Sequence, residues 1–309
     1  MRHAFSLGLN RILITTRNKV FIFFTLLMPL GMFFFFAGFV AKGQPLAVAY
    51  WMAPIVSMTV MGSFWGLSIN LVTYREQGIL RRFRLAPVSA SDILASTILA
   101  NFVLTIPTVI LEVVLARWLY HVRNLGNLFS FALLVIIALF AFAALGLVVA
   151  SVTNSVQETQ IISQIIWFAL LAPIIPMPLL PAIAKRFIVF LPSTYLVTGL
   201  QRALLLGLQP EKLWIEFSAL AAWALLAFFL STQIFRWEPE ETIPRKAKLW
   251  ALATILPFLI LGAWENRYGH VQTQSSSIYR MATAAEDSQP ANPPQQPAPQ
   301  PVPAQQAPR

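Results

Sequence analysis

The stretch YREQGILRRFRLAPVSASD, residues 74–92, indicates how the chain is organised, because it is a charged island between two long apolar runs. The runs, residues 51–72 and 93–118, are each long enough to cross a bilayer, since about 20 residues at ~1.5 Å rise match ~30 Å of hydrocarbon. The island must therefore lie in water, and the chain on either side of it is predicted to cross a membrane.

Composition extends this prediction to the whole chain. Of 309 residues, 57% are hydrophobic and 11% are charged, whereas about 25% of the residues of a soluble domain are charged. We therefore expect an all-α, polytopic membrane helix bundle. The net charge of +10 does not indicate a nucleic-acid partner, because the basic residues stand between apolar runs and are explained by topology. The absence of cysteine excludes disulfides, thiolate metal sites and a cysteine nucleophile.

The island has the pattern of a short amphipathic helix. Ile79, Leu80 and Phe83 share one helical face, and Pro87 ends the helix because proline cannot continue the hydrogen-bond ladder. The arginines that project elsewhere are Arg75, Arg81, Arg82 and Arg84. From this pattern alone, a generic linker that lies on anionic lipid is an equally good interpretation.

Two motifs resemble those of one family. The run REQGILRRFRLAPVSASDIL, residues 75–94, resembles the cytoplasmic coupling helix between the second and third spans of the type-2 ATP-binding cassette (ABC) export permeases. The family's pattern is matched by Arg75, Glu76, Gly78, Leu80, Arg81, Phe83 and Pro87. A second run, LPSTYLVTGLQRALL, residues 191–205, resembles the Pro-x-x-Tyr segment that precedes the family's final span. The resemblance extends over residues 1 to about 236 and implies a core of six spans.

The predicted spans follow the apolar runs. They cover residues 20–41, 51–72, 92–118, 128–151, 159–182 and 213–235. Several prolines predict a re-entrant or outer pair of short helices over residues 173–206, because broken backbone is tolerated at membrane depth only where protein or a water-filled cavity covers it. The excess of Lys and Arg before the first span and in the island predicts a cytoplasmic N-terminus. We expect a multi-pass protein of the cell (inner) membrane.

The remainder departs from a six-span plan. Residues 237–248 are predicted to form a cytoplasmic linker, and residues 249–264 a seventh span, with an interfacial helix as the alternative. Residues 265–309 are rich in Pro and Gln and low in large apolar side chains. Such a tail is expected to be disordered, because it cannot bury enough apolar surface to offset the entropy of ordering.

Four residues within the spans are candidates for other roles. Gly62 and Gly66 have the spacing of a small-xxx-small packing motif, which serves either packing within the subunit or a dimer interface. Glu112 and Asn101 are candidates for the translocation path, because a carboxylate at membrane depth is costly. Alternatively, Glu112 reaches Arg117 or interfacial water and is structural.

The sequence offers no site for ATP hydrolysis or other catalysis. It contains no GxxxxGK[ST] phosphate loop, so this chain is not expected to be an enzyme or to bind a cofactor. The resemblance implies that a separate ATPase subunit binds ATP and Mg²⁺ and grips residues 74–87. Ile79, Leu80 and Phe83 would enter an apolar cleft of that ATPase. Its acidic rim, or lipid phosphate, would pair with Arg81, Arg82 and Arg84.

The resemblance also implies a second permease subunit, identical or related, and a cargo that is a drug, a lipid or a polysaccharide. An ion-gradient-driven secondary transporter is the alternative, and it predicts ionisable groups within the spans. A membrane scaffold or a lipid-modifying membrane enzyme is a third hypothesis.

Overall fold

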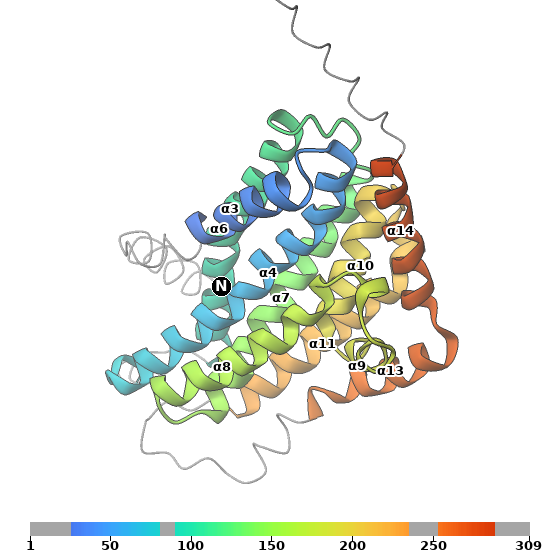
Figure 1. The fold of residues 1–309 in the computed structure, drawn as a ribbon. Coiled ribbons are helices and arrows are strands. Elements are labelled where there is room, and N and C mark those ends of the chain that lie inside the picture. The colour runs from blue at the N-terminus through green and yellow to red at the C-terminus, as the bar shows by residue number, and fades with distance from the viewer. Residues whose placement is uncertain (1–25, 81–89, 235–252, 288–309) are drawn as a thin grey trace, which may run out of the picture.

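The computed structural model describes residues 26–80, 90–234 and 253–287 (Figure 1). These residues form helices packed side by side, and among them there is no strand. Four helical stretches are long and apolar enough to cross a membrane: Pro45–Glu76, Asp92–Trp118, Leu128–Val152 and Pro210–Gln233. The prediction of an all-α, polytopic membrane bundle is confirmed.

The bundle begins with a short apolar helix and one very long one. Helix α3, Met28–Phe35, continues into a π-helical turn, η2, Phe36–Val40. Together, α3 and η2 form most of the described part of the predicted first span. Helix α4, Pro45–Glu76, has 32 residues and is therefore about 48 Å long. It starts earlier than predicted because Pro45 is preorganised for the first helical turn, and it exceeds the ~30 Å of a bilayer core.

Helix α7, Leu128–Val152, lies at the centre of the bundle and packs against α4 and α11. It begins where the Asn127 side chain accepts hydrogen bonds from two backbone N–H groups of the first turn, which have no partner within the helix. At Gly146 the helix passes so near α4 that an added Cβ would lie 2.6 Å from the Phe64 carbonyl oxygen. Helix α6, Ala90–Trp118, packs beside both.

The region after α7 is broken by prolines. Helix α8, Val156–Leu171, ends in two 3₁₀ turns, η3 (Ala172–Ile174) and η4 (Met177–Leu179). Two helices follow, α9 (Ala182–Ile188) and α10 (Pro192–Leu205), which are bent by 93° relative to each other. Tyr195 stabilises the bend, because its hydroxyl donates to the Val189 carbonyl at 2.8 Å. Most of α10 is buried, as irregular backbone in a membrane requires.

The C-terminal part is helical beyond the last predicted span. It contains η5 (Pro210–Leu213), α11 (Trp214–Gln233), α13 (Leu256–Tyr268) and α14 (His270–Asp287). Helix α13 has 13 residues, about 20 Å, and is not among the candidate spans. The predicted linker, residues 237–248, and the first residues of the predicted seventh span lie outside the described residues.

The prediction that the tail is disordered from residue 265 is wrong as far as Asp287. Helix α14 runs along α4 and α10 (Figure 1), and one face of it is buried through Val271, Ser275, Ile278 and Ala282. This spacing matches a single helical stripe. The stripe has few large apolar side chains. Tyr50 of α4 adds to the apolar surface by packing in one cluster with Ile278 and Ala282. Residues 288–309 lie outside the described part of the chain.

Candidate functional site

The coupling segment, residues 74–87, starts with a turn at the end of α4. Gly78 has a φ of 68°, the left-handed conformation that glycine adopts most easily at a helix end. The Gly78 N–H donates to the Arg75 carbonyl and the Gln77 N–H to the Thr73 carbonyl, each at 3.0 Å. Gly78 is therefore explained by the end of α4. Five residues predicted to contact an ATPase lie outside the described residues: Arg81, Arg82, Phe83, Arg84 and Pro87.

Arg75 caps the end of α7. Its guanidinium donates from Nη1 to the Ala150 carbonyl at 2.9 Å and from Nη2 to the Thr153 carbonyl at 2.6 Å. The last carbonyls of a helix have no partner within it, and a cation there also suits the helix dipole. Arg75 is only 3% exposed. Arg75 was predicted to project from a face other than that of Ile79, Leu80 and Phe83, and the structure shows that its planar fork binds two carbonyls inside the bundle.

Glu76 makes the complementary contact with the next helix. Its Oε1 accepts a 2.8 Å hydrogen bond from the N–H of Val156, the first residue of α8. A carboxylate suits the positive end of the helix dipole. Consecutive residues of α4 thus hold the end of α7 and the start of α8. We call this arrangement of Arg75, Glu76, Ala150, Thr153 and Val156 the Arg75–Glu76 junction.

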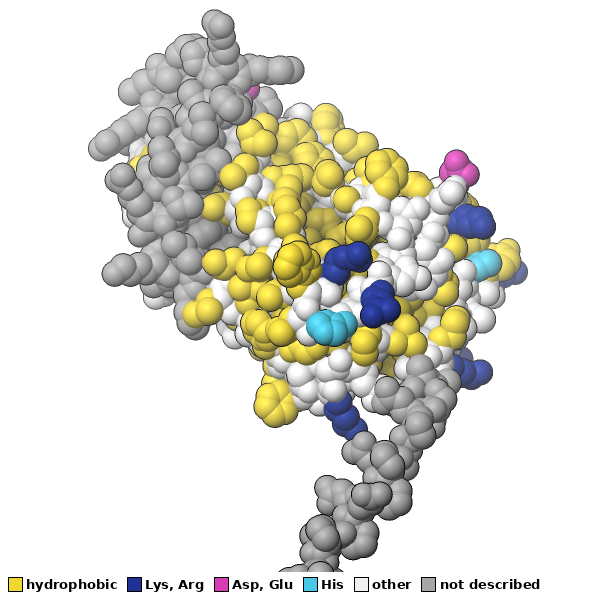
Figure 2. Space-filling view, turned by 90° about the horizontal axis from the view of Figure 1, so that it is seen from above, with side chains coloured by type: hydrophobic (Ala, Val, Ile, Leu, Met, Phe, Trp, Pro, Cys, Tyr) yellow, Lys and Arg dark blue, Asp and Glu magenta, His cyan; other side chains and the backbone are white. Residues whose placement is uncertain are grey.

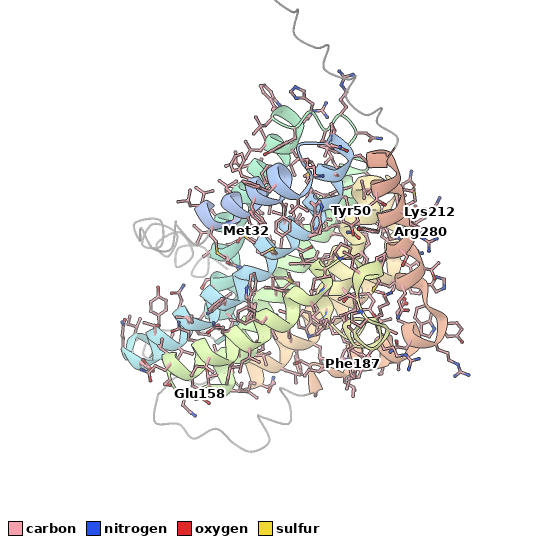
Figure 3. All side chains as sticks on the ribbon, viewed as in Figure 1. Met32, Tyr50, Glu158, Phe187, Lys212 and Arg280 are labelled. Atoms are coloured by element: carbon pink, nitrogen blue, oxygen red, sulfur yellow. The ribbon has the colours of Figure 1, made fainter. Side chains whose placement is uncertain are left out.

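Further capping makes the turn between α7 and α8 well defined. The Ser155 hydroxyl accepts from the Glu158 N–H at 3.1 Å, and Glu158 Oε2 accepts from the Asn154 N–H at 2.7 Å. The Ser-x-x-Glu spacing of a capping box is readable in the sequence and is the signal that would have located this helix start. Glu158 lies at one end of the bundle, with Tyr50 and Lys212 toward the other (Figure 3).

Leu80 faces the bundle and not the solvent. It is 2% exposed and belongs to an apolar cluster with Leu71, Leu94 and Leu147 of α4, α6 and α7. The prediction that Leu80 enters an apolar cleft of an ATPase is therefore corrected: its burial fixes the coupling segment to its own chain. Ile79 is half-buried, while Gln77 is exposed.

The glycine pair of α4 faces α8 of the same chain at Gly62. A Cβ added there would lie 3.7 Å from the Trp167 ring, an ordinary van der Waals contact. Gly66 is half-buried. The close helix approach in this chain uses Gly146 instead, which is followed by the small residue Ala150 four positions later. A dimer interface at Gly62 and Gly66 stays a prediction.

Glu112 joins α6 to α4. The Thr59 hydroxyl donates to Glu112 Oε1 at 2.7 Å, and Glu112 is fully buried. Arg117, expected as its partner, instead donates to the Arg123 carbonyl at 3.2 Å. Asn101 is half-buried on the same helix, about 16 Å away along the axis for a separation of 11 residues. Glu112 and Asn101 therefore share a helix face but do not form one site.

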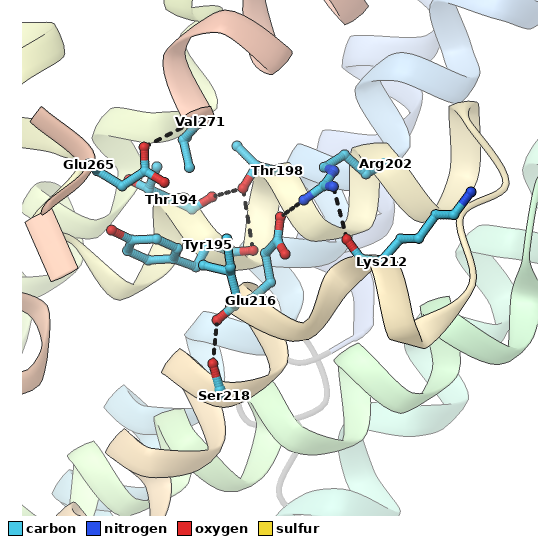
Figure 4. A network of polar contacts seen from close by, with 10 residues as sticks. Thr194, Tyr195, Thr198, Arg202, Lys212, Glu216, Ser218, Glu265 and Val271 are labelled. Carbon is cyan, nitrogen blue, oxygen red and sulfur yellow. Dashed lines mark hydrogen bonds and ion pairs between the residues drawn. The ribbon is translucent and has the colours of Figure 1, made fainter. Parts of the chain in front are cut away.

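A second polar group joins α10 to α11, and Glu265 of α13 lies near it (Figure 4). The Arg202 guanidinium forms an ion pair with Glu216 of α11 and donates from Nη2 to the Lys212 carbonyl at 3.0 Å. Both side chains of the pair are buried. Arg202 is therefore a structural anchor between α10 and α11, and its partner Glu216 lies 14 residues later in the chain.

Glu265 of α13 lies beside this group. It is fully buried, and its Oε2 accepts from the Val271 N–H of α14 at 3.0 Å. Burial raises the pKa of the Glu265 carboxyl above its ordinary value, and nearby Glu216 raises it further. The Val271 hydrogen bond and His270 lower this pKa and oppose part of the effect.

In the described part of the chain, no cluster of three or more His, Cys, Asp or Glu residues could hold a metal ion.

Comparison with known families identifies the bundle. A model of the ABC-2 family of transporter proteins matches residues 40–232, from the turn before α4 to the end of α11. No curated protein and no solved structure gives a significant match. The family match covers more than half of the 309 residues and leaves α13 and α14 beyond it. The chain therefore belongs to the ABC-2 family of transporter proteins and is a multi-pass membrane transport subunit.

Proposed function

We propose that this chain is the permease subunit of an ABC exporter and that a separate ATPase subunit drives it. The ATPase would bind ATP and Mg²⁺ and dock at residues 74–87, on the cytoplasmic side of the inner membrane. A second permease subunit, identical or related, would complete the path. The proposal rests above all on the family match over residues 40–232.

The Arg75–Glu76 junction supports a mechanism for the coupling. A displacement of the segment after Gly78 would be carried directly to the end of α7 and the start of α8, because Arg75 and Glu76 bind both. Helix α8 leads into the proline-broken turns before α9 and α10. Closure of the ATPase would thus tilt α8 relative to α4 and change the exposure of the path between them.

The cargo proposed is an amphipathic or lipid-like molecule, with drugs and polysaccharides as the other classes that the family resemblance implies. The described spans carry few buried charges, and each of these has a partner within the chain. Glu112 bonds Thr59, and Glu216 pairs with Arg202. A path with so few charges favours an apolar cargo over a small ion, since a small ion requires polar groups to replace its water.

Docking of the ATPase is tested by changing Phe83 and Leu80 in two separate variants. We expect Phe83→Asp to abolish co-purification of the ATPase in detergent while the permease still inserts. Leu80→Asp should instead lower the stability of the permease itself, because Leu80 is buried in its own chain. Lys212→Glu, an exposed change toward the other end of the bundle, is the matched control. Full ATPase association of Phe83→Asp would rule out the contact.

Reconstitution tests the energy source. In vesicles that contain the permease and its ATPase, we expect export of a fluorescent lipid to require ATP and to stop when the ATPase is omitted. Export that instead collapses with the ion gradient would establish the secondary-transporter alternative. The absence of any flux with a panel of lipids, drugs and glycans would favour the scaffold hypothesis.

The orientation is tested separately. Because the chain has no cysteine, Gln77→Cys and Lys42→Cys can each be labelled alone with a membrane-impermeant maleimide in intact cells. Both positions are exposed. We expect Lys42→Cys to be labelled from outside the inner membrane and Gln77→Cys only after lysis. The reverse pattern would contradict a cytoplasmic coupling segment.

A further inference from the structure

The end of the bundle opposite the Arg75–Glu76 junction, called here the far end, carries a group of basic side chains. Lys42 lies in the turn between η2 and α4, Arg117 in the last turn of α6, and Arg123 in the loop before α7. All three are exposed. We call them the cationic tip. Figure 2 views this end and shows Lys or Arg side chains and a His gathered over a largely hydrophobic surface.

Tyr120 brings the two loops of the tip together. A Cβ added to Gly43 would lie 4.0 Å from Tyr120 Cδ1, and the Tyr120 ring meets Phe33 edge-on with centroids 5.7 Å apart. Arg117 donates to the Arg123 carbonyl at 3.2 Å, so these two cations are also neighbours. The tip is therefore one surface, although its residues are up to 81 positions apart in the sequence.

The sequence segments that present these cations contain no acidic residue beside them. The sequence contains no Asp or Glu before Glu76 and none from residue 113 to residue 157. Glu112, the one carboxylate near the end of α6, is fully buried against Thr59. A positive potential on an exposed surface attracts an anion.

The backbone at the tip is also unusual. Among the described residues, only Lys42 and His121 combine a side chain larger than glycine with a positive φ, 49° and 55°. Such conformations cost free energy and recur at functional sites. The His121 ring is held by a 3.1 Å contact from Nδ1 to the Trp118 carbonyl. The strain thus falls on the two loops that present the cations.

Exposed aromatic side chains border the tip and indicate its depth in the membrane. Phe39, Trp118 and Phe129 are 78%, 79% and 70% exposed. Aromatic residues concentrate at the level of the lipid headgroups, and Lys and Arg extend toward the phosphates from there. A surface with cations at headgroup level and aromatic rings beside them complements a molecule with an anionic head and apolar chains.

We propose that the cationic tip binds the phosphate of an anionic phospholipid, with its acyl chains against Phe39, Trp118 and Phe129. The lipid would stabilise the packing of the η2–α4 turn on the α6–α7 loop. The proposal is independent of the cargo and of the ATPase, since it concerns the far end alone.

Fluorescence quenching in nanodiscs tests the proposal. The chain has no cysteine, so Leu119→Cys, at a position 54% exposed beside the tip, carries one fluorophore. Brominated phosphatidylglycerol and brominated phosphatidylcholine are compared as quenchers at equal mole fractions. We expect phosphatidylglycerol to reach half-quenching at a fraction more than about tenfold lower. Each cation near a membrane surface contributes about a fivefold preference, so Lys42→Gln/Arg123→Gln should lose most of it.

The control is Lys212→Gln, an exposed cation outside the tip, which should retain the preference. Equal quenching by the two lipids in the unmodified tip would overturn the proposal, as would an unchanged preference in the double variant. Loss of the preference on adding glycerol phosphate, which has the headgroup without chains, would assign the tip to soluble anions and also overturn it. If the double variant does not fold, Lys42→Gln and Arg123→Gln are measured singly against the same expectation of about fivefold each.

Discussion

The Arg75 guanidinium donates a 2.6 Å hydrogen bond to the carbonyl of Thr153, which joins the last turn of α4 to the residue that follows α7. The neighbouring bond, to the Ala150 carbonyl, has a length of 2.9 Å. Glu76 extends the connection to α8 through the Val156 N–H. Arg75 and Glu76, at the start of the coupling segment, therefore bond to other helices of the permease. We expect the contacts with the ATPase to be made by the residues after them.

Arg75→Gln should lower the free energy of unfolding by about 1.5–3 kcal/mol, the range for hydrogen bonds to a charged group. Arg75→Lys should recover only part of this, because an ammonium cannot reproduce the planar fork. Thermal unfolding in detergent measures the change, with Gln77→Ala at the exposed neighbour as the control. An Arg75→Gln variant as stable as the control would contradict the capping role.

The same variant tests the coupling. If the junction transmits motion, Arg75→Gln should bind the ATPase normally and hydrolyse ATP, yet export less cargo per ATP. Vesicle export and ATPase activity measured on the same sample give this ratio. An unchanged ratio in a folded variant would show that the junction is structural only.

Gly146→Ala should destabilise the permease by about 1–3 kcal/mol, the usual cost of overpacking. The added Cβ would lie 2.6 Å from the Phe64 carbonyl oxygen, and backbone atoms cannot move aside as a flexible side chain can. Gly62→Ala is the matched change in α4, where the nearest atom is 3.7 Å away, and it should be close to neutral. Equal unfolding midpoints for the two variants would contradict the close α4–α7 approach.

Removing one partner of the Arg202–Glu216 pair should cost about 3–5 kcal/mol, because it leaves a buried charge uncompensated. We therefore expect Arg202→Met and Glu216→Leu each to be strongly destabilising. The double variant should recover much of the loss, since neither charge then remains. Thermal unfolding of all three variants gives the coupling energy, and purely additive losses would contradict the pairing.

The packing of α13 and α14 should weaken as the pH rises. Because the pKa of Glu265 is raised above its ordinary value of 4.5, the folded state holds this proton more tightly than the unfolded chain does. The protonated carboxyl's contribution to stability is fully present below the ordinary pKa of 4.5. It is lost as the pH rises through the pKa that Glu265 has in the folded state. The groups that face Glu265 are the Val271 N–H, His270, Glu216 and Tyr195.

Hydrogen exchange of the α14 amides measures this effect. Glu265→Gln cannot ionise, so it should protect α14 equally at acid and neutral pH, while the natural chain loses protection relative to it as the pH rises. Comparing the two proteins at each pH removes the intrinsic pH dependence of exchange. A constant ratio between them would contradict the role of Glu265.

Local sequence patterns were sufficient to predict the class of the protein and the positions of its main helices. Runs of apolar residues such as 128–151 must be helical in lipid, because a helix satisfies its own backbone hydrogen bonds. The charged island at residues 74–92 separated two spans for the same reason. The two motifs at 75–94 and 191–205 were sufficient to indicate the family, since they are local patterns that need no folded neighbours.

The side chains of those motifs that face inward could not be predicted from local patterns, because they depend on the helices packed around them. Arg75 and Leu80 have the residue types of a docking surface, but the end of α7 and the cluster around Leu94 bury them. Helix α14 likewise has too few apolar residues to order alone and depends on the surface that α4 and α10 provide. Burial is a property of two surfaces that meet, and the sequence of one surface does not contain the position of the other.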